Sequence, residues 1–363
     1  MTAQPLKFAI AGVGNCSSSL LQGIEHSRSR VNEPMSGVRF ETIGGLAPSD
    51  LHCVAAFDID ARKVGQPLED AIFAAPNCVK KHVPSMRKSG VTVQMAPVLD
   101  GLAPHMAEYD ETSAFRPSKA QPVDIVAALK ASQAEALVCY LPVGSEEAVR
   151  MFAEACLEAG IAMVNCVPVF LASDPKWAER FTKAGVPIVG DDIKSQFGAT
   201  IVHRTLAQLL TDRGCILDRT YQLNTGGNTD FLNMLARNRL VSKRKSKTQS
   251  VQSVLEEPLP AKDVHIGPSD YVSWQGDNKV AFIRLEGRGF CDAPIEMEVR
   301  LSVQDSPNSA GVVIDALRCA GLAKRNGISG PLEGVSAYTM KSPPRQMRDA
   351  IASAEIEKFA AKF

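Results

Sequence analysis

Several features that would fix a compartment or a partner are missing from this chain. No apolar run reaches the roughly 18 residues of a membrane-spanning helix, and the N-terminus has no apolar core of a signal peptide. None of the nine cysteines forms a C-x-x-C pair, which argues against a zinc cluster or a disulfide framework and for reduced thiols. We therefore expect a soluble, cytoplasmic protein with no membrane partner.

Net charge is missing as well. The 40 basic residues balance the 40 acidic ones, so the formal net charge is +0 at pH 7. Such a chain has no overall field to attract nucleic acid, and any anion must be bound by a local group of cations. With 363 residues, 45% of them hydrophobic, the chain is long enough for two domains with large cores.

The first residues follow the pattern of a dinucleotide site. Residues 6–11 form an apolar run typical of a strand, the glycine turn 12–17 follows it, and residues 18–24 have helical character. A strand, a tight glycine turn and a helix N-terminus are what a pyrophosphate requires. Ser17 stands where a third glycine is usual, which indicates looser helix packing or an extra hydroxyl for the phosphate. The cofactor contacts predicted in this turn are Gly12, Gly14, Asn15 and Cys16.

Asp58 favours a nucleotide site over an ordinary glycine-rich turn. It ends a second buried run at 53–58, and an acid at this place can bind the hydroxyls of the adenosine ribose. Its separation from the glycines is about twice the usual one, and an inserted segment at 27–50 accounts for the excess. We therefore expect Asp58 to contact the cofactor.

The first half of the chain alternates strands with helices. Apolar runs predict strands at 136–141, 162–166 and 186–190. Helical patterns lie at 124–133, 145–160 and 176–184. This alternation is typical of an α/β fold with a Rossmann-type, doubly wound parallel sheet, whose ligands bind at the carboxyl ends of the strands.

Several polar residues follow these strands. Ser145 opens a helix, so it would either wall the nicotinamide side of the cofactor or simply cap the helix. Asp191, Asp192 and Ser195 come after another strand, where charge is not needed for folding and acids are expected to face the ligand crevice. Asp305 closes a later strand in the same way. Two such carboxylates could hold a substrate hydroxyl or a divalent or monovalent cation, although no His or Cys cluster lies beside them.

The pattern changes near residue 200. A helical segment at 199–212 precedes alternating runs at 219–223, 280–286 and 295–303. Strict alternation predicts an antiparallel sheet with one face covered. Helical patterns return at 309–325 and 345–361, and we expect this tail to pack on the first domain. The predicted domains are a cofactor-binding domain at 1–200, completed by 306–363, and an α+β catalytic and oligomerisation domain at 201–305.

The most polar segment runs from Asn224 to Lys247. Its first seven residues hold amides, hydroxyls, glycines and one carboxylate, and are too polar for a core strand and too rich in glycine for a helix interior. Amides suit hydroxyls and lysines suit phosphate, so the segment predicts a site for a phosphorylated, hydroxyl-rich molecule. The alternative is a surface loop with a solvated basic run, and Lys279 and Lys341, taken singly, would also be solvated.

Taken together, these motifs resemble those of the shorter prokaryotic myo-inositol-1-phosphate synthases. The resemblance extends over nearly the whole chain, and its specific parts are residues 12–15, 141–147, 190–195, 231–235, 263–270, 305–311 and 340–343. It implies a homotetrameric, NAD-dependent isomerase that converts D-glucose 6-phosphate to 1L-myo-inositol 1-phosphate. One departure is Thr229, where the longer eukaryotic relatives carry asparagine, and we expect it to change only how the loop holds the cofactor.

The resemblance implies roles in the active site for residues that composition alone would place on the surface. The implied catalytic residues are Lys243, Lys247, Lys279, Lys341, Asp192 and Asp305. The further implied contacts to cofactor and substrate are Asp191, Ser195, Asn224, Asn228, Asp230 and Lys243.

The implied reaction starts with hydride transfer from C5 to NAD+, while Lys279 or Lys341 accepts the proton of the C5 oxygen. Loss of a C6 proton then gives an enolate that an ammonium group stabilises. C6 attacks the C1 aldehyde, with Lys243 and Lys341 near the C1 oxyanion, and the hydride returns to C5. Lys247 holds the phosphate. Repulsion among the lysines should lower their pKa values, which makes general base catalysis feasible.

Composition and spacing alone leave two rivals open. One is a net NAD-dependent dehydrogenase of a sugar phosphate, and the other is a non-catalytic NAD-binding sensor on the same fold. Four lysines around one site argue against the sensor, since binding alone does not require them.

Overall fold

The chain folds around a parallel sheet of seven strands, which confirms the predicted α/β class. The computed structural model describes residues 4–30 and 33–363, except for the side chains of Pro268 and Ser269, so part of the inserted segment and of the 263–270 motif lies outside the described residues. The strand order is β11 (Gly330–Pro331), β6 (Pro187–Val189), β5 (Ala162–Asn165), β4 (Ala136–Cys139), β1 (Leu6–Ala11), β2 (Leu51–Asp58) and β3 (Val93–Met95). Each neighbouring pair is parallel.

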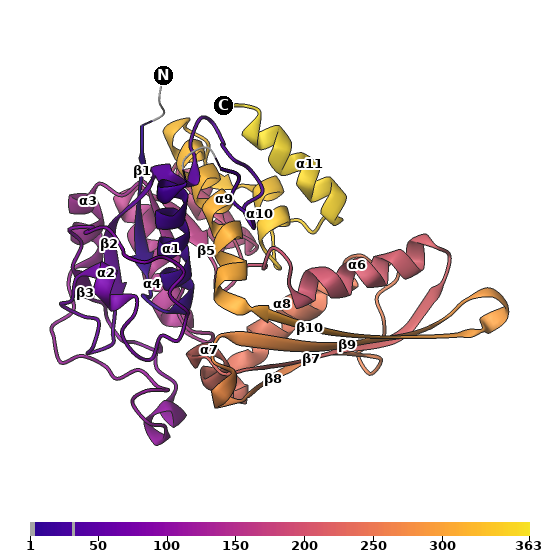
Figure 1. Cartoon of the computed structure of the whole chain (residues 1–363). Coiled ribbons are helices and arrows are strands. Elements are labelled where there is room, and N and C mark those ends of the chain that lie inside the picture. The colour runs from indigo at the N-terminus through magenta and orange to yellow at the C-terminus, as the bar shows by residue number, and fades with distance from the viewer. Residues whose placement is uncertain (1–3, 31–32) are drawn as a thin grey trace.

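Helices cover both faces of this sheet because its strands are apolar on both sides (Figure 1). In β1, Phe8 and Ile10 belong to one core, and Ala9 and Ala11 to the other, as the two-residue period of a strand requires. The first core contains side chains of α1 (Asn15–Ser29) and α9 (Asp305–Arg325). The second contains side chains of α3 (Ile125–Ser132), α4 (Glu146–Ala159) and α5 (Pro175–Lys183). The short helix α2 (Leu68–Ala71) follows β2.

The C-terminal segment returns to the first sheet, as expected. Helix α9 packs along α1, β11 extends the sheet beside β6, and α10 (Glu333–Thr339) packs on α11 (Asp349–Ala360). The described part of the inserted segment is held by α9. Arg318 donates to the carbonyl oxygens of Phe40 and Leu46 at 2.7 and 2.9 Å, and Asp315 accepts from the backbone N–H of Arg39 at 3.0 Å.

The second sheet has four long strands, in the order β10 (Pro294–Gln304), β9 (Asn278–Arg288), β7 (Ile216–Gly226) and β8 (Val264–Tyr271). Strand β9 is antiparallel to both of its neighbours, which confirms the predicted arrangement of β7, β9 and β10. Strand β8, which was not predicted, runs parallel to β7. The reason is a crossover: α7 (Thr229–Asn233) and α8 (Val241–Gln252) carry the chain back to the end of the sheet from which β7 started.

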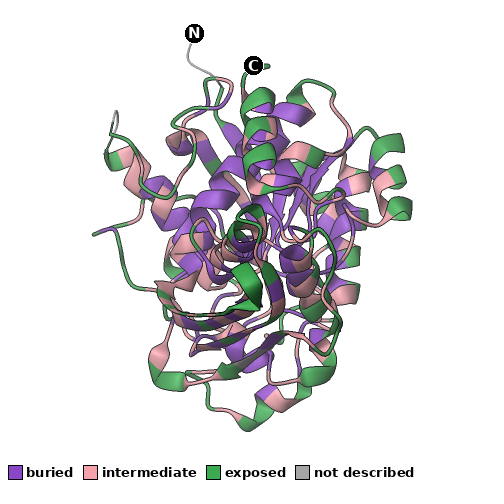
Figure 2. Ribbon diagram, turned by 90° about the vertical axis from the view of Figure 1, so that its right-hand side faces the viewer, coloured by how far each residue is buried: buried purple, intermediate pink, exposed green. Residues whose placement is uncertain are grey.

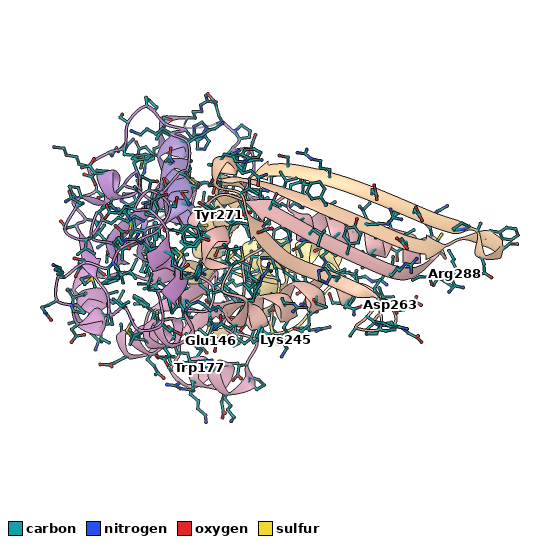
Figure 3. All side chains as sticks on the ribbon, turned by 90° about the horizontal axis from the view of Figure 1, so that it is seen from below. Glu146, Trp177, Lys245, Asp263, Tyr271 and Arg288 are labelled. Atoms are coloured by element: carbon teal, nitrogen blue, oxygen red, sulfur yellow. The ribbon has the colours of Figure 1, made fainter. Side chains whose placement is uncertain are left out.

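One face of this sheet is covered by α8 and by α6 (Ala199–Asp212), which matches the predicted segment 199–212 (Figure 1). Ala281, Ile283 and Leu285 of β9 form a small core there. The opposite face is visible from below in Figure 3, and the cross-strand pair Leu223 and Phe282 is 41% and 42% exposed on it. Figure 2 shows the contrast between the buried strands of the first sheet and the exposed residues of the second. None of the helices in the described residues is long and apolar enough to cross a membrane.

Candidate active site

A cavity of about 230 Å³, partly open to solvent, lies between the two sheets. It starts at the carboxyl ends of β1, β2 and β4 and extends to α8 and to the first residues of β9 and α9. Ligands of doubly wound sheets bind at this edge. The cavity therefore connects the predicted cofactor turn with the predicted lysines.

The glycine turn has one crowded and one open position. Gly12 has a φ of 93°, and a Cβ there would lie 2.9 Å from the carbonyl oxygen of Tyr140. A Cβ on Gly14, the N-cap of α1, would meet no atom within 4 Å. The open space lies beside the first N–H groups of α1, which have no partner within the helix. This arrangement fits the pyrophosphate of a dinucleotide.

The Ser17 hydroxyl is engaged within the protein and does not point to the expected phosphate contact. Its hydroxyl donates to the carbonyl oxygen of Gly12 at 2.5 Å, and the side chain is fully buried. The hydroxyl therefore stabilises the turn and is not available to a phosphate.

The other predicted cofactor residues of this end line the cavity. Asp58 accepts hydrogen bonds from the backbone N–H groups of Val13 and Ile59, both at 2.7 Å. Asn15 accepts from the backbone N–H of Cys78 at 2.7 Å. Burial raises the pKa of the Cys16 thiol to about 12, with a further contribution from nearby acids, so the thiol is neutral at physiological pH.

The structure adds residues that the sequence analysis missed. Lys63 is 3% exposed and donates to the carbonyl oxygen of Val13 at 2.8 Å and to Oδ1 of Asn77 at 2.9 Å. Burial lowers the pKa of this ammonium group. The apolar side chains of Ile59, Val98 and Phe115 line the same end of the cavity, where a flat ring would fit. These residues lie far apart in the sequence and share no motif.

At the other end, lysines alternate with acids. Nζ of Lys279 lies 3.1 Å from Oδ1 of Asp305, and Nζ of Lys341 lies 3.0 Å from Oδ1 of Asp192. Nζ of Lys243 lies 3.5 Å from Oδ2 of Asp230. All six of these residues line the cavity, and they come from α7, α8, α9, β9 and two loops.

Asp192 is fixed on both sides. It has a φ of 62°, a left-handed conformation that aspartate tolerates better than most residues. Its second carboxylate oxygen accepts from the hydroxyl of Ser246 in α8 at 2.6 Å. Burial alone would raise the pKa of Asp192, but the ammonium groups of Lys341 and Lys243 outweigh it and hold the pKa below its usual range. Asp192 therefore stays ionised.

Lys247 is the unusual cation of the site. It is 5% exposed and lines the cavity, and its ammonium group makes no hydrogen bond or ion pair with the described residues. Burial lowers its pKa well below the usual range, and repulsion from Lys279, Lys243 and Lys341 adds to the effect. A buried, unpaired ammonium group is costly for the fold, and an anionic ligand would relieve that cost.

The expected mutual lowering of lysine pKa values is confirmed for two lysines and wrong for a third. Burial lowers the pKa of Lys341 as well as that of Lys247. The pKa of Lys243 is raised instead, because Asp230, Asp192 and Asp305 together outweigh the effect of its burial. Lys243 is therefore a permanent cation near neutral pH.

Three predicted contacts do not line the cavity. Asp191 is fully buried behind it, where its carboxylate accepts from the backbone N–H groups of Leu171 and Ser173, both at 3.0 Å. Ser145 is also fully buried, and its hydroxyl neither faces the cavity nor caps α4. Asp100 caps that helix instead, by accepting from Glu147 N–H at 2.9 Å.

Asn224 is the third of these residues. It lies in β7 and is 1% exposed, and its Oδ1 accepts from Nε2 of Gln222 at 3.0 Å. The polarity of the segment 224–230 did not prevent regular structure, since residues 224–226 end β7 and Asn228 caps α7 through the N–H of Asp230 at 3.1 Å. Polar side chains here replace solvent as hydrogen-bond partners.

Ser195, Asn228 and Asp230 line the cavity as predicted. Within the described residues, three or more His, Cys, Asp or Glu side chains gather nowhere in a way that could hold a metal ion. Asp192 and Asp305 each face an ammonium group, so a cation at either acid would have to displace a lysine.

Replacing Lys247 by methionine should stabilise the protein and weaken phosphate binding. We expect the free energy of unfolding to rise by about 1–3 kcal/mol near pH 7, since a buried unpaired charge is removed. The gain is full below the lowered pKa of the folded state, falls as pH rises, and is lost above 10.5, where the lysine becomes neutral in the unfolded chain too. Urea unfolding at several pH values measures it, with the exposed Lys245→Met as the control on the same helix.

Comparison with known proteins agrees with this geometry. Residues 198–306 match the family model described as myo-inositol-1-phosphate synthase. The chain is 53% identical over 362 residues to the inositol-3-phosphate synthase of Mycolicibacterium smegmatis, covering 98% of both chains. It is 54% identical over 355 residues to that of Mycobacterium tuberculosis, covering 98% of this chain and 95% of the relative.

Solved structures show the same fold. A myo-inositol-1-phosphate synthase-related protein from Thermotoga maritima has a TM-score of 0.80 over 98% of both chains at 22% identity, which is a likeness of fold alone. The identity to the two mycobacterial enzymes extends over nearly the entire chain and includes both sheets and the cavity between them. The chain therefore belongs to the myo-inositol-1-phosphate synthase family.

Proposed function

We propose that the protein converts D-glucose 6-phosphate to 1L-myo-inositol 1-phosphate, as the first step of inositol biosynthesis. The main support is the continuity of one cavity from a glycine turn at the start of α1 to four lysines interleaved with acids. A reaction that oxidises, deprotonates, cyclises and re-reduces one sugar phosphate needs a cofactor and several cations within reach of a single ligand.

NAD would be held by the glycine turn, with Asp58 at the adenosine ribose and Ile59, Val98 and Phe115 around the adenine. When bound, NAD supplies a reversible hydride acceptor for C5. The open space at Gly14 and the free end of α1 support this placement. Lys63 holds the turn in shape through the carbonyl of Val13.

The electrostatics divide the lysines by role. Lys341, whose pKa is lowered, is suited to accept the proton of the C5 hydroxyl. Lys279 then stabilises the enolate that forms as the substrate phosphate takes the C6 proton, and Lys243, a permanent cation, stabilises the C1 oxyanion during ring closure. Lys247, without a counterion among the described side chains, binds the phosphate.

Asp192 and Asp305 orient Lys341 and Lys279 at 3.0 and 3.1 Å. A divalent or monovalent cation at either acid would compete with the ammonium group already there. We therefore assign the stabilisation of negative charge to the lysines.

Incubating the protein with glucose 6-phosphate and substoichiometric NAD+ tests this function. Inositol phosphate, followed by phosphorus NMR, should accumulate beyond the NAD+ supplied, and absorbance should show no net NADH. The hydride returns to the same substrate, so the cofactor is recycled at every turnover. NADH rising in step with an oxidised sugar phosphate would instead establish the rival dehydrogenase, and no turnover at all would favour the sensor.

We propose that the protein is a homotetramer in which copies meet across the second sheet. The uncovered face of that sheet carries the apolar pair Leu223 and Phe282 beside the charged residues Arg284, Glu286 and Arg219. An apolar patch with a polar rim on long strands is typical of a subunit interface. Sedimentation should give the mass of four chains, and Phe282→Lys should lower it.

We also propose a cytoplasmic location. All nine cysteines are free, which is typical of proteins in a reducing compartment. Recovery of the protein with secreted or membrane fractions of the cell would contradict this proposal.

A further inference from the structure

A buried carboxylate outside the cavity ties together three segments of the active site. Asp277 lies just before β9 and is 4% exposed. Its Oδ1 accepts from Nδ2 of Asn228 at 2.9 Å and from the hydroxyl of Ser306 at 2.7 Å. Its Oδ2 accepts from the backbone N–H of Ser306 at 3.0 Å. One side chain therefore joins the start of β9, the start of α7 and the start of α9.

Asp277 supplies the cap that α9 lacks. The N-cap residue of α9, Gln304, makes no capping bond with its side chain. The side-chain carboxylate of Asp277 accepts from the backbone N–H of Ser306 instead. The backbone carbonyl oxygen of Asp277 accepts from the backbone N–H of Asp305 at 3.0 Å. An acid at a helix N-terminus is also favoured by the helix dipole. These bonds fix the first turn of α9, which carries Asp305 toward Lys279.

The other partner of Asp277 controls the second lysine pair. Asn228 uses Oδ1 to cap α7 and Nδ2 to bind Asp277, so both ends of its amide are engaged. The capped residue Asp230 then faces Lys243 at 3.5 Å. A shift of the Asn228 amide would move Asp230, while a shift of Ser306 would move Asp305.

An ionised acid is costly at this buried position. Burial, together with the nearby Asp305 carboxylate, raises the pKa of Asp277 to about 6 and makes its ionised form costly. Three donors converge on the group, however, and only a carboxylate accepts all of them.

We propose that Asp277 is a positioning residue of the active site, which sets the Lys279–Asp305 and Lys243–Asp230 pairs at the spacing that enolate formation and ring closure require. The role rests on the proposed function, and Asp277 itself touches neither substrate nor cofactor. Its carboxylate acts through Asn228 on one side and through Ser306 on the other.

A reciprocal exchange tests this role. Asp277→Asn leaves one acceptor oxygen where three donors converge, so its NH2 group must face either Nδ2 of Asn228 or the backbone N–H of Ser306. We therefore expect kcat to fall about 10–100-fold while KM for glucose 6-phosphate and Kd for NAD+ change less than about 3-fold. Asn228→Asp should lower kcat similarly, because it sets two carboxylates face to face. The double variant restores a donor and an acceptor to the pair and still caps α7, so it should recover at least about 10-fold of the loss.

The control variant and the double variant distinguish a positioning role of Asp277 from a merely structural one. The exposed Asp70→Asn is the control for the change of Asp to Asn and should retain wild-type kcat. Should the Asp277→Asn chain not fold, a normal kcat in folded Asn228→Asp would overturn the role. A double variant no faster than either single variant would overturn it too, as would a loss confined to the melting temperature. Wild-type protein that forms no inositol phosphate would overturn the proposed function itself, and the positioning role with it.

Discussion

Replacing Lys279 by alanine should lower kcat by about 10²–10³-fold and leave NAD+ binding intact. Lys279 lines the cavity at the start of β9, its Nζ lies 3.1 Å from Oδ1 of Asp305, and its side chain is 20% exposed. Negative charge that develops on the substrate would lose its nearest preorganised cation. Asp305 would also lose its counterion, and its carboxylate would then repel the enolate.

The measurement combines product formation, followed by phosphorus NMR, with NAD+ binding, followed by calorimetry. Lys245→Ala is the matched control, since Lys245 lies over the ring of Phe170 at 5.2 Å and does not line the cavity. Lys245 is exposed and is labelled in Figure 3. A Lys279→Ala variant with more than about a tenth of wild-type kcat would falsify the assignment of Lys279 to the enolate.

The two glycines of the first turn should respond to substitution in opposite ways. Gly14→Val should weaken NAD+ binding about 100-fold, or about 2.7 kcal/mol, without loss of stability. Gly14 has a φ of −94°, which any residue adopts, and a Cβ there would point into open space that a pyrophosphate needs.

Gly12→Ala should destabilise the fold by about 1–3 kcal/mol, because it combines a positive φ with a Cβ placed 2.9 Å from the carbonyl oxygen of Tyr140.

Thermal unfolding without NAD+ separates the two effects. Gly12→Ala should lower Tm by about 2–4 °C per kcal/mol, and Gly14→Val should leave it unchanged. Adding NAD+ should raise the Tm of Gly14→Val much less than that of the wild type at the same NAD+ concentration. Stabilisation of Gly14→Val by NAD+ equal to that of the wild type would place the pyrophosphate elsewhere.

Local pattern predicted the first domain well because its strands are apolar on both faces and its glycine turn follows a fixed motif. The segments at 6–11 and 199–212 were predicted to the residue. The run at 136–141 was predicted too long, since Tyr140 and Leu141 leave the sheet and line the cavity. The run at 186–190 was predicted one residue too long at each end. Strand β8 was missed because glycine, proline and an acid interrupt its apolar pattern.

The polar residues of the site were harder to place. Position after a strand predicted that Asp191 and Asp192 both face the crevice, but the chain turns between them and buries Asp191 among backbone N–H groups. The sequence does not single out Asp277 as a site residue, because it lies near Lys279 in a short polar turn. Its importance comes from Asn228 and Ser306, which lie 49 and 29 residues away in the chain.

The sequence by itself predicted the class of fold and the glycine turn, because these depend on local periodicity and on a motif with fixed spacing. The set of lysines and acids came from the resemblance to a known family, because composition alone leaves single lysines in solvent. Only the tertiary structure decided which lysine faces which acid, which carboxylates are structural, and how far each pKa moves. Those properties depend on distance and burial between segments remote in the chain, and electrostatic interactions change steeply with both.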